Sequence, residues 1–501
     1  MRIYKEIIKA KNGSEIPVFV SGKTMESRYN PERDSENLLN TINEEAGFFL
    51  VLGAGSGIFL KQLSEKFSQS KILCVELYKE DIDFLMRLSL IKMLAETKRV
   101  IFCCLEEFEN CLIQNYLPAK YGTLKIIEER AWINENQSQL EKIKSILNKT
   151  LGLISADYSV QSHFGKIWTS NILNNARLAE QYNSQAFKNH ISGNLNKTAV
   201  IVAAGPSLDK TISTISQNRN NYFLIATDTA GQSLLKRNIF PDIIVSIDAQ
   251  AVSYNHFINR KIKDNKTIFA FDLASNFSAA RHICKSGNEV FFFTSGHPLA
   301  SAINLSCNSP LPHYFSGAGT VTITALDLAI EAGFKNLLIL GADFSYINSK
   351  AYTKGTYLDS LYNKNSSKTN EAEKSFSSLM FRTELIKLNQ KKNTTQILVA
   401  YKNSMENYLK EKNISFTKEG DIYKLQNSAG AASLAYDKNS FSPSSFSLKP
   451  FFNKLKTSSI EDAEIFLLPY VAWLRNNIKY KDINYKDLLK LALESIVSYN
   501  I

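Results

Sequence analysis

A glycine-led turn within residues 199–209, AVIVAAGPSLD, is the segment of this chain best suited to bind an anion. An apolar run of strand character ends at Gly205, and Pro206 and Ser207 then begin a segment of helical character. Glycine lets a ligand approach the backbone, and proline has the φ of a first helical position. Because the first N–H groups of a helix are free and its dipole is positive there, the turn predicts a phosphate site. The alternative is a strand-to-helix turn without a ligand.

Polar residues end the predicted strands that follow this turn. Thr227 and Asp228 end the first, Ser246 and Asp248 end the second, and Asp343 ends a later one. In a parallel α/β sheet, ligands bind beyond the carboxyl ends of the strands. The alternative for Asp228, and similarly for Asp248, is that the side chain only caps the next helix. The coincidence of polar residues at several strand ends favours a ligand site.

A second anion-type turn lies in residues 316–334, SGAGTVTITALDLAIEAGF. Ser316 and Gly317 precede a long helical pattern that begins at Thr320. The first N–H groups of this helix are expected to face the same side of the sheet as the first turn. Two helix N-termini at one crevice suit a diphosphate or a phosphodiester.

A tyrosine-rich and lysine-rich segment, FSYINSKAYTKGTY, follows Asp343. The phenols of Tyr346 and Tyr352 can stabilise the charge on a departing phosphate without a metal ion. No motif requires a metal or another cofactor, although Asp228 and Asp248 could together hold a divalent cation. The alternative is a loop without a chemical role.

The alternation of expected elements indicates an α/β protein. We expect a Rossmann-like N-terminal domain over residues 1–127, a helical connector over 128–196, a central domain over 197–370 and a mainly helical C-terminal domain over 371–501. Near-continuous runs of Ile, Val, Leu and Phe in the central domain predict a doubly wound, mostly parallel sheet with helices on both faces.

The N-terminal domain has a glycine loop of its own, VLGAGSG, at residues 51–57. Glu76 ends the next expected strand, where an acid can bind a ribose. The glycines alternate and lack the spacing of the dinucleotide motif. The loop therefore indicates a structural Rossmann-like domain, with binding of S-adenosylmethionine as the alternative.

The composition indicates an ordered globular protein, with 44% hydrophobic and 11% aromatic residues. The net charge of +11 is spread along the chain, so we expect no nucleic-acid partner. The six cysteines lack metal-ligand spacing and suit a cytoplasmic protein. No segment reaches the roughly 18 apolar residues of a membrane-spanning helix. We expect a soluble protein in the cytoplasm.

The central segments GPSLD, TD, NIFPDIIVSIDA, SGAGTVTITALDLAIEAGF and LLILGADFSY occur in an order that resembles the motility-associated-factor (Maf) family of flagellin glycosyltransferases. The core domain of that family is similar to the MptE-like domain of archaeal hydroxymethylpterin diphosphokinases. The same order resembles bacterial sialyltransferases that use cytidine-monophosphate sugars without a metal. The resemblance covers about residues 197 to 360 and implies a fold like that of GT-A-type glycosyltransferases and sialyltransferases.

The resemblance also implies roles for the candidate residues. The nucleotide, its sugar and its phosphate would be contacted by Gly205, Pro206, Ser207, Thr227, Asp228, Ser246, Asp248, Ser316, Gly317 and Thr320. Tyr346 and Tyr352 would stand where the sialyltransferases bind the leaving phosphate.

The chain departs from the sialyltransferases at the general base. Those enzymes use a histidine further downstream, whereas this chain has none after His313. Tyr352 lies where relatives have a loop histidine. The base is left open among Asp343, Asp359, His297, His313 and a residue that the sequence does not identify.

Three functions remain open at this point. The first is a glycosyltransferase that moves a sugar from a nucleotide sugar to Ser or Thr of flagellin; a nonulosonic acid, carried by cytidine monophosphate (CMP), is one candidate. The second is pyrophosphoryl transfer from ATP to a pterin, with magnesium on Asp228 and Asp248. The third is a non-catalytic protein that binds a nucleotide or flagellin, which the missing histidine favours.

Overall fold

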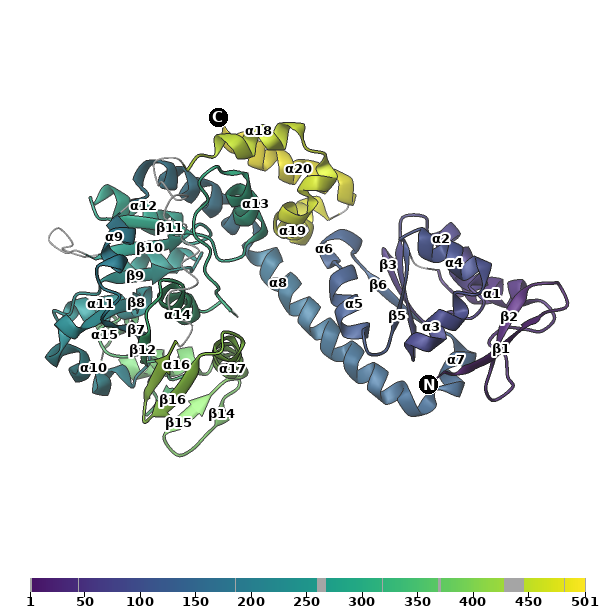
Figure 1. Cartoon of the computed structure of the whole chain (residues 1–501), viewed down its shortest axis with the longest axis horizontal. Coiled ribbons are helices and arrows are strands. Elements are labelled where there is room, and N and C mark those ends of the chain that lie inside the picture. The colour runs from purple at the N-terminus through teal and green to yellow at the C-terminus, as the bar shows by residue number, and fades with distance from the viewer. Residues whose placement is uncertain are drawn as a thin grey trace. The chain divides into compact units, whose positions relative to one another are not determined.

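The structure is a computed structural model that describes residues 2–43, 45–184, 186–258, 267–317, 319–367, 371–427, 446–481 and 483–500. It separates into two compact units (Figure 1). The first comprises Met1–Gly165 and Leu467–Ala492, and the second comprises Lys166–Phe466 and Leu493–Ile501. The division therefore falls inside the segment expected to be a connector and again inside the expected C-terminal domain.

The first unit contains a parallel sheet with the strand order β5-β4-β3-β6. These strands are β3 (Phe48–Leu52), β4 (Lys71–Glu76), β5 (Val100–Cys104) and β6 (Leu124–Glu128). An antiparallel hairpin of β1 (Tyr4–Lys9) and β2 (Glu15–Phe19) precedes them. The helices that follow or connect the strands are α1 (Pro31–Asn40), α2 (Ile58–Lys66), α3 (Lys79–Leu85), α4 (Ser89–Glu96), α5 (Phe108–Asn115), α6 (Pro118–Tyr121) and α7 (Arg130–Glu135). Strand β3 is buried along its whole length, as expected for a central parallel strand covered on both faces.

The second unit is built on an eight-stranded sheet with the order β11-β10-β9-β8-β7-β12-β17-β16. Its strands are β7 (Thr198–Val202), β8 (Tyr222–Thr227), β9 (Ile243–Ser246), β10 (Ile268–Asp272), β11 (Val290–Phe293), β12 (Asn336–Leu340), β16 (Ser415–Glu419) and β17 (Ile422–Gln426). The strands from β11 to β12 are parallel and can be followed in that order in Figure 1. The prediction of a doubly wound, mostly parallel sheet is confirmed.

The direction of the winding reverses between β7 and β12. From β7 the chain adds strands outward to β11, and it then returns to place β12 on the other side of β7. The carboxyl ends of the two strands at such a reversal diverge into a crevice, where ligands of doubly wound sheets bind. The fold therefore offers one preferred position for a site.

Alternate residues of the strands face two different layers of helices. On one face, Ile201 and Ile225 pack in a core cluster with Ile323 of α14 (Val321–Glu331). On the other, the side chain of Ile244 packs against Gly231 of α11 (Asp228–Lys236). Full burial of one such aliphatic side chain stabilises the fold by roughly 1.5–3 kcal/mol. Burial of the apolar side chains thus stabilises the sheet, and the sheet positions the residues at the strand ends.

The remaining helices of the second unit follow the expected alternation and continue into a helical C-terminal region. They are α9 (Ala186–Ser192), α10 (Leu208–Gln217), α12 (Phe277–Lys285), α13 (Pro298–Ser306), α15 (Tyr357–Lys364), α16 (Ala372–Met380), α17 (Gln396–Glu411) and α18 (Lys449–Thr457). Helices α8 (Gln137–Tyr182), α19 (Ile460–Asn476) and α20 (Tyr485–Val497) each contribute residues to both units. No helix in the described part of the chain is long and apolar enough to span a membrane.

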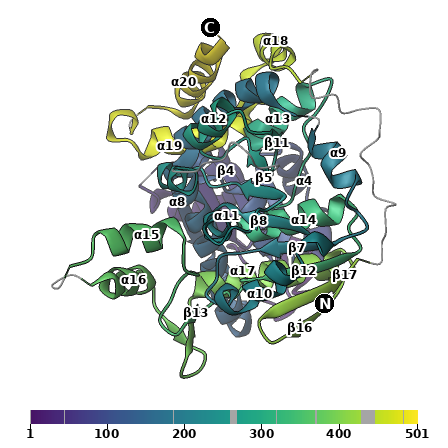
Figure 2. The same cartoon turned by 90° about the vertical axis from the view of Figure 1, so that its left-hand side faces the viewer.

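The sequence did not predict the strands that follow residue 371. β17 pairs antiparallel with β12, and β16 pairs with β17 at the edge of the sheet (Figure 2). A small second sheet joins β13 (Tyr346–Ile347), β15 (Lys392–Thr394) and β14 (Ile386–Lys387). These strands are short, and all but β13 contain lysine. Their alternation of apolar and polar residues is therefore a weaker signal than the long apolar runs of the central sheet.

Candidate functional site

A pocket of about 250 Å³ lies at the carboxyl ends of β7, β8 and β12, where the winding reverses. The sequence-predicted residues that line it are Gly205, Thr227, Asp228, Thr320, Asp343, Tyr346 and Tyr352. The other predicted residues, which lie outside its lining, are Pro206, Ser207, Ser246, Asp248, Ser316 and Gly317. The pocket therefore brings together residues from segments more than a hundred positions apart.

The glycine of the first turn has a structural cause. The Gly205 N–H donates to the carbonyl of Gly341 at 2.8 Å, and a Cβ on Gly205 would overlap that carbonyl oxygen and the Asp343 carboxylate. Gly341 has a φ of +70°, and a Cβ there would overlap the carbonyl of Ala203. The close approach of the β7 and β12 ends therefore requires both glycines, with or without a ligand.

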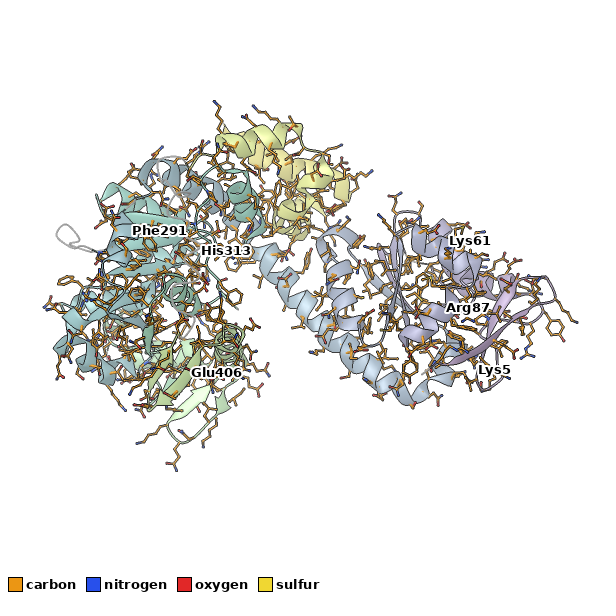
Figure 3. All side chains as sticks on the ribbon, viewed as in Figure 1. Lys5, Lys61, Arg87, Phe291, His313 and Glu406 are labelled. Atoms are coloured by element: carbon orange, nitrogen blue, oxygen red, sulfur yellow. The ribbon has the colours of Figure 1, made fainter. Side chains whose placement is uncertain are left out.

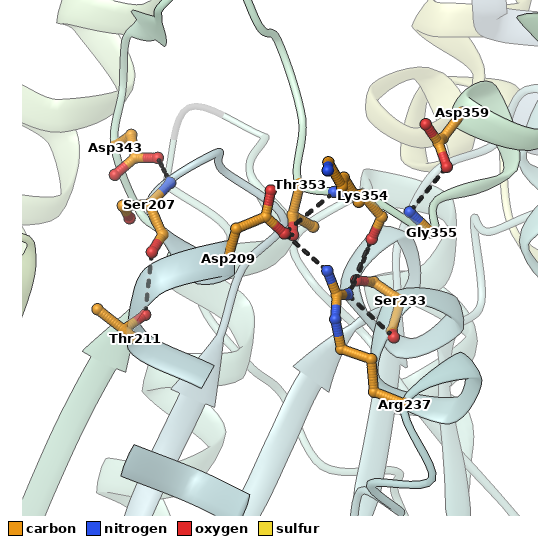
Figure 4. Close-up of polar contacts among 10 residues, drawn as sticks. All are labelled: Ser207, Asp209, Thr211, Ser233, Arg237, Asp343, Thr353, Lys354, Gly355 and Asp359. Carbon is orange, nitrogen blue, oxygen red and sulfur yellow. Dashed lines mark hydrogen bonds and ion pairs between the residues drawn. The ribbon is translucent and has the colours of Figure 1, made fainter. Parts of the chain in front are cut away.

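The first N–H groups of α10 are not free, contrary to the sequence expectation. The Ser207 N–H donates to Asp343 Oδ2 at 2.8 Å (Figure 4), and the Leu208 N–H donates to the Gly205 carbonyl at 3.1 Å. Burial raises the pKa of Asp343, while the hydrogen bonds from Ser207 lower it. The carboxylate of Asp343 thus takes the place that the sequence assigned to a phosphate.

Asp228 is held at the pocket by hydrogen bonds to both carboxylate oxygens. Thr227, not Asp228, caps α11, because its Oγ1 accepts the Ala230 N–H at 3.3 Å. The Asp228 carboxylate accepts the Thr229 N–H at 2.7 Å and the Ser246 hydroxyl at 2.7 Å. Ser246 therefore orients Asp228 from the neighbouring strand end.

Asp248 lies close enough to Asp228 for the two charges to interact. Its Oδ1 accepts the Gln250 N–H at 2.9 Å. Burial raises the pKa of Asp248, and the negative charge of Asp228 raises it further. The two carboxyl groups follow the adjacent strands β8 and β9, and only Asp228 lies in the pocket lining.

The second predicted turn contributes one of its three candidates to the pocket. Thr320 caps α14, and its Oγ1 accepts the Thr322 N–H at 3.3 Å. Ser316 instead donates to the Ser295 carbonyl at 3.3 Å. Gly317, with a φ of +55°, packs closely against Ile323. The start of α14 therefore faces the pocket through Thr320 and its neighbours.

Residues 344–357, here called the tyrosine loop, carry Tyr346 and Tyr352 into the pocket. Burial raises the pKa of Tyr352 to about 12, and the neighbouring Tyr357, Tyr346 and Asp228 also raise it. The phenol therefore keeps its proton at neutral pH and can donate a hydrogen bond to a phosphate oxygen. Burial also raises the pKa of Tyr346.

The backbone of the tyrosine loop includes three non-glycine residues with positive φ. Phe344 has a φ of +48°, Asn348 of +50° and Ser349 of +58°. A left-handed residue other than glycine costs roughly 1–2 kcal/mol. Contacts elsewhere must therefore hold this loop in place.

Some pocket residues had not been predicted from the sequence. Leu398 and Tyr401 of α17 form part of the lining, although they lie in the region expected to be a separate C-terminal domain. Thr229, Thr322 and Phe344 lie one or two positions from predicted residues, so extending each motif by that much would have found them. For α17 the sequence carries no such signal, because its place depends on β16 and β17 joining the sheet.

Helix α8 contacts the loops at the carboxyl ends of β9 and β10, which do not line the pocket. Asn171 Nδ2 donates to the carbonyls of Ala249 and Ala274, each at 3.2 Å. Asn175 Nδ2 donates to the carbonyls of Leu273 and Ser275, at 2.9 and 2.8 Å. These bonds occupy the loops after β9 and β10, which leaves the pocket at β7, β8 and β12.

Of the four candidates for a general base, Asp343 lines the pocket and the other three do not. His297 caps α13, and burial lowers its pKa to about 4. His313 pairs with Thr294 beyond β11, the strand of Phe291, and both His313 and Phe291 are labelled in Figure 3. Asp359 accepts the Gly355 N–H at 3.0 Å.

Side chains of the first unit occupy two backbone N–H groups of its glycine loop, and a pocket of about 590 Å³ borders the loop at Ser56. Glu76, fully buried, accepts the Ala54 N–H at 2.7 Å, the Trp132 Nε1–H at 2.8 Å and the Tyr4 hydroxyl at 3.1 Å. Burial raises the pKa of Glu76 to about 7. Glu26 accepts the Ser56 N–H at 2.5 Å. These contacts take up the groups that a nucleotide would use.

Fold and site together define an α/β protein with a pocket at the reversal point of a doubly wound sheet. Residues 170–349 match the family described as 6-hydroxymethylpterin diphosphokinase MptE-like. The match begins at residue 170 and therefore includes the last part of α8, which carries Asn171 and Asn175.

Relatives occur among curated proteins of Treponema pallidum (strain Nichols). One uncharacterized protein is 33% identical over 148 residues, which cover 29% of this chain and 69% of that protein. A second uncharacterized protein is 27% identical over 229 residues, covering 46% of this chain and 75% of that protein. The chain belongs to the MptE-like family.

Among solved structures, the chain is similar to one described as the structure of MAf glycosyltransferase from Magnetospirillum magneticum AMB-1. The two have a TM-score of 0.46 and 12% sequence identity. The alignment covers 99% of this chain and 91% of that one.

Proposed function

We propose that the protein is a glycosyltransferase that binds the nucleotide part of an activated sugar in the pocket at β7, β8 and β12. One observation carries the proposal: the β7 turn, the β8 end, the start of α14 and the tyrosine loop all line a single pocket. These are the segments whose order resembles the Maf and sialyltransferase families. The pocket also lies at the position where doubly wound sheets bind ligands.

In the proposed reaction, the oxygen of an acceptor hydroxyl attacks the anomeric carbon of the sugar. The bond between that carbon and the phosphate oxygen breaks, and its electron pair stays on the phosphate. Phenol hydroxyls of Tyr346 and Tyr352 donate hydrogen bonds to the phosphate as its charge develops. Asp343, whose pKa is raised by burial, accepts the proton of the acceptor hydroxyl.

The charge of the pocket disfavours a donor with two phosphates more than a donor with one. Among its described lining residues are two carboxylates, Asp228 and Asp343, and no lysine, arginine or histidine. A diphosphate would bring two negative charges next to these carboxylates, whereas a phosphodiester brings one. A CMP-linked sugar such as a nonulosonic acid therefore fits this setting better than a sugar on a nucleoside diphosphate. Ser or Thr hydroxyls of flagellin are the proposed acceptors, by resemblance to the Maf family.

The decisive experiment is a binding titration of the full chain with cytidine, uridine, guanosine and adenosine nucleotides, with and without magnesium. We expect CMP to bind and to raise the melting temperature, and magnesium to change this little. Release of CMP from a CMP-sugar in the presence of flagellin, with a gain of mass on flagellin, then tests the transfer. Absence of binding by all nucleotides would favour a non-catalytic protein.

A second candidate is pyrophosphoryl transfer to a pterin, as in the description of the matched family. The interaction of Asp248 with Asp228 favours it, because two nearby carboxylates can share a divalent cation. Asp248 and Asp228 would hold the magnesium of bound ATP, whose role would be to neutralise the charge on the transferred group. Binding of ATP that depends strictly on magnesium, without binding of CMP, would establish this candidate over the first.

A further inference from the structure

The tyrosine loop is tied to α10 and α11 immediately after Tyr352. Asp209 Oδ1 accepts three hydrogen bonds: from Arg237 Nη2 at 2.7 Å, from Thr353 Oγ1 at 2.5 Å and from the Lys354 N–H at 3.2 Å. Figure 4 shows these contacts converging on the one carboxylate. Asp209 is the last residue of the GPSLD segment and lies in the first turn of α10.

Arg237 reaches the same stretch of the loop from the end of α11. Its Nη1 donates to the Lys354 carbonyl at 2.8 Å and to Ser233, and the Ser233 hydroxyl donates to the Lys354 carbonyl at 2.6 Å. The Thr353 N–H donates to the carbonyl of Ala204, in the turn before Gly205, at 2.9 Å. Residues 353 and 354 are thus fixed to α10, to α11 and to the turn at Ala204, and the last two of these also line the pocket.

This anchor determines where the adjacent phenol lies. Tyr352 precedes Thr353 directly, so its Cα stands about 3.8 Å from a fixed residue. Earlier in the loop, Phe344, Asn348 and Ser349 have positive φ. That part is held by the pairing of β13 with β15 and by the bond from the Asn348 N–H to the Lys391 carbonyl, whereas the anchor holds residues 353 and 354 next to Tyr352.

We infer that Asp209 and Arg237 are positioning residues that hold the tyrosine loop so that Tyr352 faces the pocket. Asp209 does not line the pocket and Arg237 does not either, so both act through the loop. The importance of this position for phosphate binding rests on the proposed function. The anchoring itself does not, and it can be measured separately.

The chain offers a matched control in the ion pair of Arg219 and Asp242. This pair has an N–O distance of 2.8 Å, against 2.7 Å for Arg237 and Asp209, and its arginine is similarly exposed, at 29% against 27%. It lies before β8 and β9, at the amino ends of the strands and away from the pocket. A general effect of losing an arginine–aspartate pair should therefore appear in variants of either pair, whereas an effect on the tyrosine loop should appear only in variants of Arg237 and Asp209.

The first experiment compares hydrogen exchange in full-length wild type, Asp209→Asn, Arg237→Lys and the control Asp242→Asn. We expect amides of residues 346–356 to exchange about tenfold faster or more in the first two variants. In Asp242→Asn these amides should exchange as in wild type. Exchange at the wild-type rate in Asp209→Asn, or equal acceleration in Asp242→Asn, would overturn the inference.

The second experiment measures CMP affinity in a double-mutant cycle of Asp209→Asn with Tyr352→Phe. If Asp209 acts through Tyr352, Asp209→Asn weakens binding by about tenfold alone and by less than about twofold in the Tyr352→Phe background. Equal losses in both backgrounds would contradict a positioning role. Faster exchange in Asp209→Asn with no CMP binding by wild type would support the anchor and reject the proposed function.

Discussion

The two glycine turns of this chain, at Gly53–Gly57 in the first unit and at Gly205 in the second, have different surroundings. In both, a serine N–H beyond a glycine donates to a carboxylate of the same unit: Ser56 to Glu26, and Ser207 to Asp343. In the first unit an indole and a buried glutamate occupy the turn itself, and the pocket of about 590 Å³ beside it touches the turn only at Ser56; in the second unit Gly205 and Asp343 themselves line a pocket of about 250 Å³. A glycine turn of this kind is therefore a place for an anion, and the surrounding side chains decide whether a ligand can enter.

The largest effect should come from opening the first turn. A Cβ on Gly53 would lie 2.6 Å from the ring of Trp132, which is fully buried against the turn. Trp132→Ala should lower the free energy of unfolding by roughly 3–5 kcal/mol, as expected for a buried tryptophan. Denaturant unfolding of the full chain, followed by hydrogen exchange in β3 and β4, would measure it. Tight binding of S-adenosylmethionine by this variant would break the comparison.

The first unit should also lose stability as the pH rises. The pKa of Glu76 is about 7 in the folded state against 4.5 for the ordinary group, so the folded state holds this proton more tightly. The resulting stabilisation is complete below about pH 4.5 and is lost as the pH rises through 7, a change of about 3 kcal/mol. Glu129, with a pKa raised by burial to about 8, extends the loss to higher pH.

Hydrogen exchange between pH 5 and pH 8, corrected for intrinsic exchange, would test this in β3 and β4. The amides of β7 and β8 serve as the internal reference. Protection in β3 and β4 that rises with pH would contradict the burial of a protonated Glu76.

A smaller loss is expected on widening the second turn. Gly205→Ala places a Cβ against the Gly341 carbonyl and should lower the free energy of unfolding by roughly 2 kcal/mol. Because β7 and β12 would separate at the pocket, CMP affinity should fall as well. The comparison variant Gly333→Ala has no atom within 4 Å of the added Cβ but has a positive φ, which Gly205 lacks, so it measures a backbone cost without a steric one. Wild-type stability of Gly205→Ala would show that the close approach is unimportant.

The smallest effect is that of removing one phenol hydroxyl from the open pocket. Tyr352→Phe should weaken CMP binding by about tenfold, the value of one hydrogen bond to a charged group, and should leave the melting temperature unchanged. Tyr423→Phe, which removes a buried hydroxyl that accepts from Lys418 outside the pocket lining, is the control. Unchanged CMP affinity in the Tyr352 variant would remove this residue from the site.

The sequence allowed the central sheet to be predicted, because β7, β8 and β12 are apolar runs whose burial leaves little freedom. It also allowed the strand-end residues to be selected, since a parallel sheet places them at one edge. It did not allow their roles to be predicted. Asp343 binds the Ser207 N–H across 136 positions, and a pairing of that kind has no local pattern.

The same limit explains the two features that the sequence analysis missed. Asp209 stands in a recognised motif, but its partners Arg237 and Thr353 are known only once α11 and the loop are placed. Leu398 and Tyr401 reach the pocket because β17 pairs with β12. The alternation of buried and exposed residues in β17 is only five residues long and lies in a lysine-rich region, so it did not predict a strand.

The antiparallel addition of β17 bears on how the family-matched segment can be handled in isolation. A fragment that ends with the match at residue 349 would lack β17 and leave β12 with unsatisfied amides and carbonyls along one side. Such an exposed, apolar strand invites pairing with another molecule and aggregation. Preparations that extend past Gln426 retain the strand that shields it.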